Sequence, residues 1–182
     1  MSQAVIFFAD GLEEIEGLTV VDMLRRAGVD IQIVSVTGNL SVTGSHKIRI
    51  TADVLFEEAD FADTGLFVLP GGMPGTLGLA EHRALGDLLK KADQDGRLIA
   101  AICAAPSVLG GLGLLSGRKA TCYPGYEEKL TGAETSADQV VCDGNIITSR
   151  GMGTAIPFSA ILADRLCGEG TGEKLLNSII YK

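Results

Sequence analysis

Cys103 has the strongest case for chemistry of any residue in this sequence. It follows the apolar run 98–102 and precedes Ala104, Ala105 and Pro106. A side chain on a tight strand-to-helix turn needs small neighbours, and proline suits a first helical turn, where a backbone N–H is not needed. Amide groups and the positive end of a helix dipole there favour thiolate over thiol. The turn alone supports a reactive thiol and a buried structural cysteine about equally.

Two further turns are expected beside Cys103, because the carboxyl ends of parallel strands meet at one edge of a sheet. The pair Gly71-Gly72 follows a strand-like run, and bare glycine amides can stabilise an oxyanion or a sulfur oxyacid. The acidic turn after the first run offers Glu16 as the polar partner of the thiol. Burial there would raise the carboxyl pKa, and a protonated carboxyl can donate a hydrogen bond to sulfur. Glu14 is interpreted as complementing the helix dipole.

Apolar runs of strand length alternate with helical patterns from start to finish. The parallel strands are predicted at 4–8, 31–36, 66–69, 98–102 and 146–149. Helices are predicted from apolar residues at helical spacing: Leu85, Leu88, Leu89 and Ala92; Ile15, Leu18, Val21 and Leu24, with a stop at Gly28; and Phe158, Ile161, Leu162 and Leu166.

Two hairpins interrupt this alternation. Segments 40–42 and 47–51 are predicted to pair after the second strand, and 140–143 is predicted to pair with 145–149. Short connections and the absence of repeats predict one domain over residues 1–182. The expected fold is α/β: a three-layer α/β/α sandwich of flavodoxin-like type, with a mainly parallel sheet and an inserted β-hairpin.

Bulk properties exclude several classes of function. The net charge of −8 disfavours binding to nucleic acid or to an anionic membrane surface. The 182 residues contain neither a long apolar span nor a signal-peptide pattern, so we expect a cytoplasmic protein. The four cysteines form no C-x-x-C pair and lie far in sequence from both histidines, so no metal is expected. The acidic first turn and the lack of a G-K-[ST] motif argue against a nucleotide cofactor.

Five segments are similar to the ThiJ/PfpI superfamily, in the branch of the Parkinsonism-associated deglycase (DJ-one-like proteins). They are GLEEIE, RRAG, VLPGG, AAICAAP and TSRGMGT, which begin at residues 11, 25, 68, 100 and 148. The resemblance covers nearly the whole chain and implies a flavodoxin-like homodimer without metal or organic cofactor. It implies that Cys103 is the redox-active nucleophile and that Glu16 is its protonated hydrogen-bond partner. It also implies that the amides of Gly72 and Ala104 face the sulfur.

The sequence departs from the family pattern at Tyr123, where many relatives carry a histidine. A tyrosine hydroxyl, with an ordinary pKa of about 10, is a poor base near neutrality, so peptidase activity is not expected. His46 stands where the family has an arginine that lines the site across the dimer, and we interpret it as an exposed hairpin residue. The sequence leaves open whether His46 or Arg26 reaches the site. Cys122 is a lower-ranked candidate for a resolving thiol.

The resemblance leaves two functions open. In the first, the Cys103 thiolate adds to small reactive carbonyls, as in a glyoxalase or protein deglycase. In the second, the protein is a non-catalytic oxidative-stress sensor or chaperone, in which peroxide oxidises Cys103 to a sulfinic acid that accepts hydrogen bonds from Glu16 and the loop amides. Both use the same residues, and the missing histidine favours the sensor or a slow enzyme that relies on Glu16.

Overall fold

A seven-stranded sheet forms the centre of the computed structural model, which describes residues 3–182. The strand order is β10-β11-β7-β6-β1-β2-β5. The strands are β1 (Ala4–Phe8), β2 (Ile31–Ser35), β5 (Val54–Leu55), β6 (Leu66–Leu69), β7 (Leu98–Ile102), β10 (Val140–Asp143) and β11 (Ile146–Ser149). Neighbouring strands are parallel except β10, which runs antiparallel to β11. The predicted, mainly parallel sheet is confirmed.

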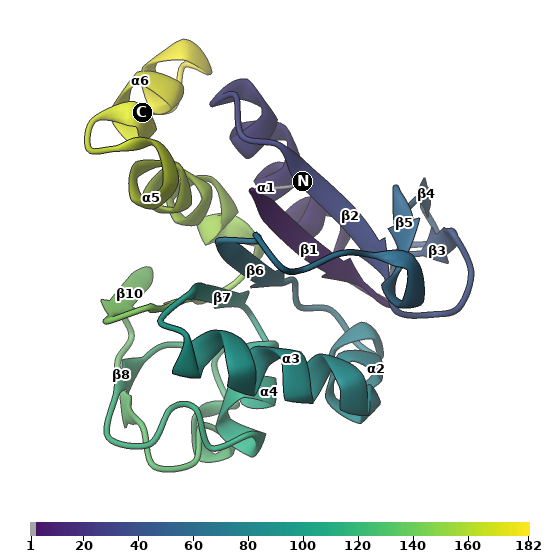
Figure 1. Cartoon of the computed structure of the whole chain (residues 1–182). Coiled ribbons are helices and arrows are strands. Elements are labelled where there is room, and N and C mark those ends of the chain that lie inside the picture. Colours follow the sequence, from purple (N-terminus) through teal and green to yellow (C-terminus); the bar gives the residue numbers. More distant parts are fainter. Residues whose placement is uncertain (1–2) are drawn as a thin grey trace.

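Helices cover both faces of this sheet (Figure 1). One layer contains α1 (Glu14–Arg26), α5 (Ala155–Cys167) and α6 (Thr171–Ser178); the other contains α2 (Gly75–Glu81), α3 (Arg83–Gln94) and α4 (Pro106–Gly111). Each face of the sheet has its own hydrophobic core, and alternate residues of β1 point into the two cores. Ile6 and Phe8 pack beneath α1 and α5, whereas Val5 and Phe7 pack beneath α3 and α4. The fold is the predicted three-layer flavodoxin-like sandwich. No helix within residues 3–182 has the length and apolar character needed to cross a membrane.

The strand predictions are confirmed to the residue for β1, β6, β7 and β11, while β2 ends one residue early, at Ser35. The inserted hairpin is present but shifted: β3 (Ser41–Thr43) pairs with β4 (Arg49–Thr51), so the turn spans 44–48. The second hairpin, β10 with β11, is confirmed. Sequence patterns did not predict β5, α6, the short pair β8 (Lys119–Ala120) and β9 (Glu134–Thr135), or the 3-10 turns η1 (Phe56–Glu58), η2 (Glu127–Lys129) and η3 (Met152–Thr154).

Helix α1 buries two acidic residues and exposes two apolar ones. Glu14 and Glu16 are 2% and 1% exposed, whereas Ile15 and Leu18 are 50% and 38% exposed. The three-residue spacing therefore predicted the helix correctly but not which of its residues face the sheet. An inward-facing pair of glutamates is unusual, since buried carboxyl groups need compensating partners.

His82 begins α3 as its N-cap. Its ring Nδ1 accepts a hydrogen bond from the Leu85 N–H at 3.1 Å, and the ring lies 4.5 Å from the Phe56 ring, centroid to centroid. The cap satisfies one of the N–H groups that a helix start leaves without a partner. The residue therefore has a structural role at the start of α3.

We predict that His82→Ala lowers the free energy of unfolding by about 1 kcal/mol through loss of this cap. His82→Asn retains a side-chain acceptor and should recover most of that loss. Urea unfolding of the three proteins measures both differences. Equal destabilisation by alanine and asparagine would assign the effect to the ring contact with Phe56 instead.

Candidate active site

Cys103 lies at the sharp turn between β7 and α4, with a backbone φ of +67°. Positive φ is uncommon for a residue other than glycine and costs on the order of 1–3 kcal/mol. Two backbone hydrogen bonds hold the turn: the Cys103 N–H donates to the Ser149 carbonyl at 2.9 Å, and the Cys103 carbonyl accepts from the Tyr123 N–H at 2.8 Å. The thiol is therefore fixed at the carboxyl edge of the sheet and remains partly exposed.

Glu16 reaches this turn from α1. Its carboxyl Oε2 accepts a hydrogen bond from the Gly71 N–H at 2.9 Å. A Cβ atom at residue 71 would lie 2.5 Å from the Cys103 Cβ and 2.7 Å from the Glu16 Oε2, so only glycine lets these two side chains approach each other. The structure thus brings Glu16 to Cys103, and Gly71 makes the approach possible.

The Glu16 carboxyl and the Cys103 thiol each change the pKa of the other. Burial raises the pKa of the Glu16 carboxyl from 4.5 to about 7, although its interaction with the Cys103 thiol and the Gly71 N–H lower it. Burial raises the pKa of the Cys103 thiol to about 12, and the Glu16 carboxylate adds to that increase. The expected preference for thiolate is therefore wrong while Glu16 is ionised, because burial and the nearby negative charge outweigh the amides at the turn.

Hydrogen bonding from the backbone of Ala104 and Gly72 lowers the pKa of the Cys103 thiol, against the larger effect of burial. Gly72 has φ +93°, and a side chain there would collide with the backbone at Glu13. Glu16 Oε1 is buried and has no hydrogen-bond partner among the described residues. The site therefore offers two amide donors and one unsatisfied carboxyl oxygen around a partly exposed sulfur.

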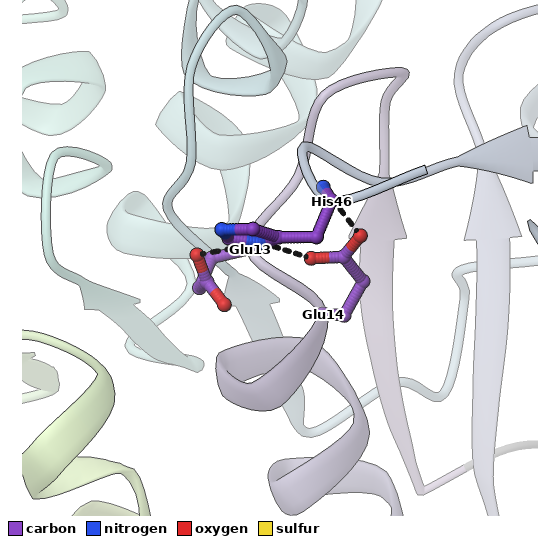
Figure 2. Close-up of side chains that lie close together, drawn as sticks. All are labelled: Glu13, Glu14 and His46. Carbon is purple, nitrogen blue, oxygen red and sulfur yellow. Dashed lines mark hydrogen bonds and ion pairs between the residues drawn. The ribbon is translucent and has the colours of Figure 1, made fainter. Parts of the chain in front are cut away.

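Glu14 has a structural role that the sequence did not reveal. Its carboxylate accepts hydrogen bonds from the backbone N–H and the ring of His46, at 2.8 and 2.9 Å (Figure 2). Burial alone would raise the pKa of Glu14, but these bonds and one from the Ile48 N–H lower it to about 2. The ionised side chain ties the 44–48 turn to α1. Glu13 lies 3.7 Å from the same ring.

Glu13, Glu14 and His46 could each offer one ligand atom, all within 4.8 Å of one another. The Glu14 oxygens already accept several hydrogen bonds, so the cluster fits an ion-paired tether better than a metal site. The carboxylates of Glu14 and Glu13 raise the pKa of His46. His46 is exposed and faces these carboxylates, as expected for a hairpin residue.

Three further candidate residues are Arg26, Cys122 and Tyr123. Arg26 pairs with Asp22 on the outer face of α1. Cys122 is buried in the core beneath α3 and α4, whereas Cys103 packs against the core beneath α1 and α5. Burial raises the pKa of Cys122 to about 11. Tyr123 is half exposed and contacts the site through its backbone N–H.

Comparison with known proteins supports the resemblance seen in the five segments. The model of the DJ-1/PfpI family matches residues 2–164. The chain belongs to the DJ-1/PfpI family. Protein DJ-1 homolog B of Arabidopsis thaliana is 42% identical over 182 residues, which cover 99% of this chain and 42% of the plant protein. The chain thus spans less than half the length of that relative.

Two further relatives match over almost their full length. The glutathione-independent glyoxalase DJR-1.2 of Caenorhabditis elegans is 32% identical over 180 residues, covering 98% of this chain and 95% of the nematode protein. The crystal structure of the C103A mutant of a DJ-1 superfamily protein from Salmonella typhimurium superposes with a TM-score of 0.95 at 31% identity, covering 100% of both chains.

The raised Glu16 pKa predicts how the stability of this family member depends on pH. Between 4.5 and about 7 the folded state keeps a proton on Glu16 that the unfolded state has lost, so stability falls as pH rises through that window. The complete loss should amount to roughly 3 kcal/mol, most of it between pH 5 and pH 8.

Unfolding in urea at pH 5 and at pH 8 measures this loss. Glu16→Gln, which cannot ionise, should remove most of the difference between the two pH values. Glu58→Gln removes an exposed carboxylate and should leave the difference unchanged. An equal pH dependence in wild type and Glu16→Gln would mean that Glu16 does not titrate in this window.

Proposed function

We propose that this protein is a cofactor-independent glyoxalase that acts on small reactive carbonyls through Cys103, with related deglycase activity on early glycation adducts. The observation that carries the proposal is the buried Glu16 carboxyl beside the thiol, with a pKa raised to about 7. A general base is most effective when its pKa lies near the working pH. The nematode relative named as a glutathione-independent glyoxalase supports the same assignment.

The first step forms a hemithioacetal. Glu16 takes the thiol proton as Sγ attacks the aldehyde carbon, so no free thiolate needs to accumulate against the raised Cys103 pKa. A C–S bond forms and the π electrons of the carbonyl move to its oxygen, which the Gly72 and Ala104 amides stabilise. Glu16 then returns the proton to that oxygen. One carboxyl therefore acts first as base and then as acid.

The next steps move hydrogen between the two carbons of the substrate. Glu16 removes the proton from the former aldehyde carbon, and the C–H electron pair forms the double bond of an enediol as the ketone oxygen takes up a proton. The adjacent carbon is then protonated and the hydroxyl on the former aldehyde carbon loses its proton, which gives a thioester of a 2-hydroxy acid. Water hydrolyses the thioester and releases the Cys103 thiol. The aldehyde carbon is oxidised by two electrons and the neighbouring carbonyl carbon is reduced by two, so the sum is R–CO–CHO + H₂O → R–CHOH–COOH. No external oxidant and no cofactor enter.

A second candidate function is an oxidative-stress sensor. A protonated Glu16 Oε1 and the two amides around Cys103 would also donate hydrogen bonds to the oxygens of a sulfinic acid, which peroxide would add to the sulfur. In this function the oxidised state is the signal and there is no turnover.

Lactate formation from methylglyoxal distinguishes these two functions. We predict that Cys103→Ser lowers kcat/KM by roughly 100-fold or more, because the nucleophile is lost. Cys142→Ser removes an exposed thiol and should retain wild-type activity. No turnover of methylglyoxal by the wild-type protein, together with stoichiometric peroxide oxidation at Cys103, would exclude the glyoxalase function and support the sensor function.

We also propose that the protein is a homodimer whose two copies meet through α1. The outer face of this helix exposes Ile15 and Leu18, and a cavity of about 580 Å³ lies between them and Ile48, Ile156 and Ile179. The same face carries Asp22 and Arg26, so it has both charges that a self-complementary two-fold interface can pair. A second copy of the chain therefore suits this surface.

Sedimentation of charge variants tests this interface. Leu18→Lys should convert the dimer to a monomer, since a cation would be buried opposite its own copy. Leu77→Lys introduces the same charge at a residue that is 49% exposed on α2, and should leave the dimer intact. Dimers that persist in Leu18→Lys would exclude this face.

We further propose that residues 1–182 act as one domain and work in a reducing compartment such as the cytoplasm. The helices on both faces share one sheet, and all four cysteines are free thiols.

A further inference from the structure

A cavity of about 340 Å³ lies between Tyr123 and the turn that follows β11. Its other lining residues include Pro124, Arg150 and Met152, and Gly151 lies among them. Tyr123 and Met152 are 50% and 51% exposed, so both present apolar surface that no other residue within 3–182 covers. Arg150 is held by a hydrogen bond from its Nη1 to the Ala137 carbonyl at 3.0 Å.

Gly151 connects this cavity to the reactive pair. A Cβ atom at residue 151 would lie 3.3 Å from the Tyr123 ring and 3.9 Å from Glu16 Oε1. Glu16 Oε1 is the buried carboxyl oxygen that lacks a hydrogen-bond partner among residues 3–182. The backbone of Tyr123 is also bonded directly to the Cys103 carbonyl. Gly151 therefore lies between the cavity and Glu16, and the backbone of Tyr123 links the cavity to the Cys103 turn.

The size and lining of the cavity indicate what it accepts. A methyl group would fill only a small part of a cavity of about 340 Å³. A flat aryl group can stack on the tyrosine ring and touch the thioether, and both contacts are favourable beyond the apolar area that they bury. Tyr123 is thus better suited to serve as a binding wall than as a base.

We propose that this cavity is the subsite for the substituent R of the substrate R–CO–CHO, and that Tyr123 and Met152 select aryl over methyl substituents. The inference rests on the proposed function, since it assumes that Cys103 attacks the carbonyl compound. Phenylglyoxal would give mandelate. The aldehyde carbon is oxidised by two electrons, the ketone carbon is reduced by two, and water supplies one oxygen of the carboxyl group.

The test uses reagents that need no turnover. 2-Bromoacetophenone and bromoacetone alkylate Cys103 with loss of bromide and carry the same phenyl and methyl substituents on the ketone. The rate ratio of the two reagents is measured on the Cys103 peptide by mass spectrometry and divided by the ratio for N-acetylcysteine. We expect a normalised preference for the aryl reagent of roughly tenfold in wild type.

Variants assign that preference to the cavity. Tyr123→Ala should abolish most of it, whereas Tyr123→Phe, which keeps the ring, should preserve it. Met152→Ala should reduce it, and Met152→Leu should restore it. Leu77→Ala shortens an equally exposed apolar side chain on α2 and should leave the ratio unchanged. An unchanged ratio in Tyr123→Ala would overturn the inference.

Parallel kinetics with phenylglyoxal and methylglyoxal separate this inference from the proposed function. Turnover of both compounds, with a preference that Tyr123→Ala does not alter, would overturn the subsite and leave the glyoxalase. No turnover of either compound, with an alkylation ratio that still depends on Tyr123, would overturn the glyoxalase and retain the aryl site beside Cys103.

Discussion

The burial of the Glu16 carboxyl beside the Cys103 thiol is the constraint on which the rest of the site depends. A carboxyl that is 1% exposed is unfavourable unless it is protonated or hydrogen-bonded, and the Gly71 N–H satisfies only one of its oxygens. To place Glu16 inward, α1 must turn Val20 and Leu24 inward as well, since they follow on the same helical face. Ile15 and Leu18 are thereby left facing outward. The acid at the site and the apolar surface outside it have one cause.

The second requirement is a backbone that can hold a thiol at this position. The turn at Cys103 adopts a positive φ, and it persists because hydrogen bonds from two directions fix it, one to Ser149 and one from Tyr123. Both partners come from segments that follow the turn in sequence, so the strand β11 and the 121–124 segment must be in place before the thiol is positioned. The thiol must also be able to approach the Glu16 carboxyl. Gly71 allows this because it has no side chain between the two groups.

The sequence was sufficient for the sheet because each strand is a short, uniform apolar run with turn residues on either side. Four strands were predicted with their observed bounds, and Cys103, Glu16, Gly72 and Ala104 meet where the parallel topology brings them. Interactions between distant segments could not be predicted in the same way. Glu14 accepts a hydrogen bond from His46, which lies 32 residues further along the chain. This bond holds the hairpin turn against α1, so Glu14 has a structural role. The thiol pKa depends on burial and on the neighbouring carboxylate, which no local pattern records.

The position of one proton links the two candidate functions. With Glu16 near pKa 7 and the Cys103 thiol near pKa 12, the proton resides on sulfur while the carboxyl exchanges its own with solvent around neutrality. Carbonyl addition and oxidation both require that the sulfur proton leave as a new bond forms, and Glu16 is the adjacent group able to accept it. The reactions then differ in what the new oxygen atoms contact. An oxyanion bound to carbon lies one bond further from sulfur than a sulfinate oxygen, so the amides of Gly72 and Ala104 cannot fit both equally well. The reach of those two amides, set by the Gly72 backbone and the Cys103 turn, therefore decides which chemistry this site favours.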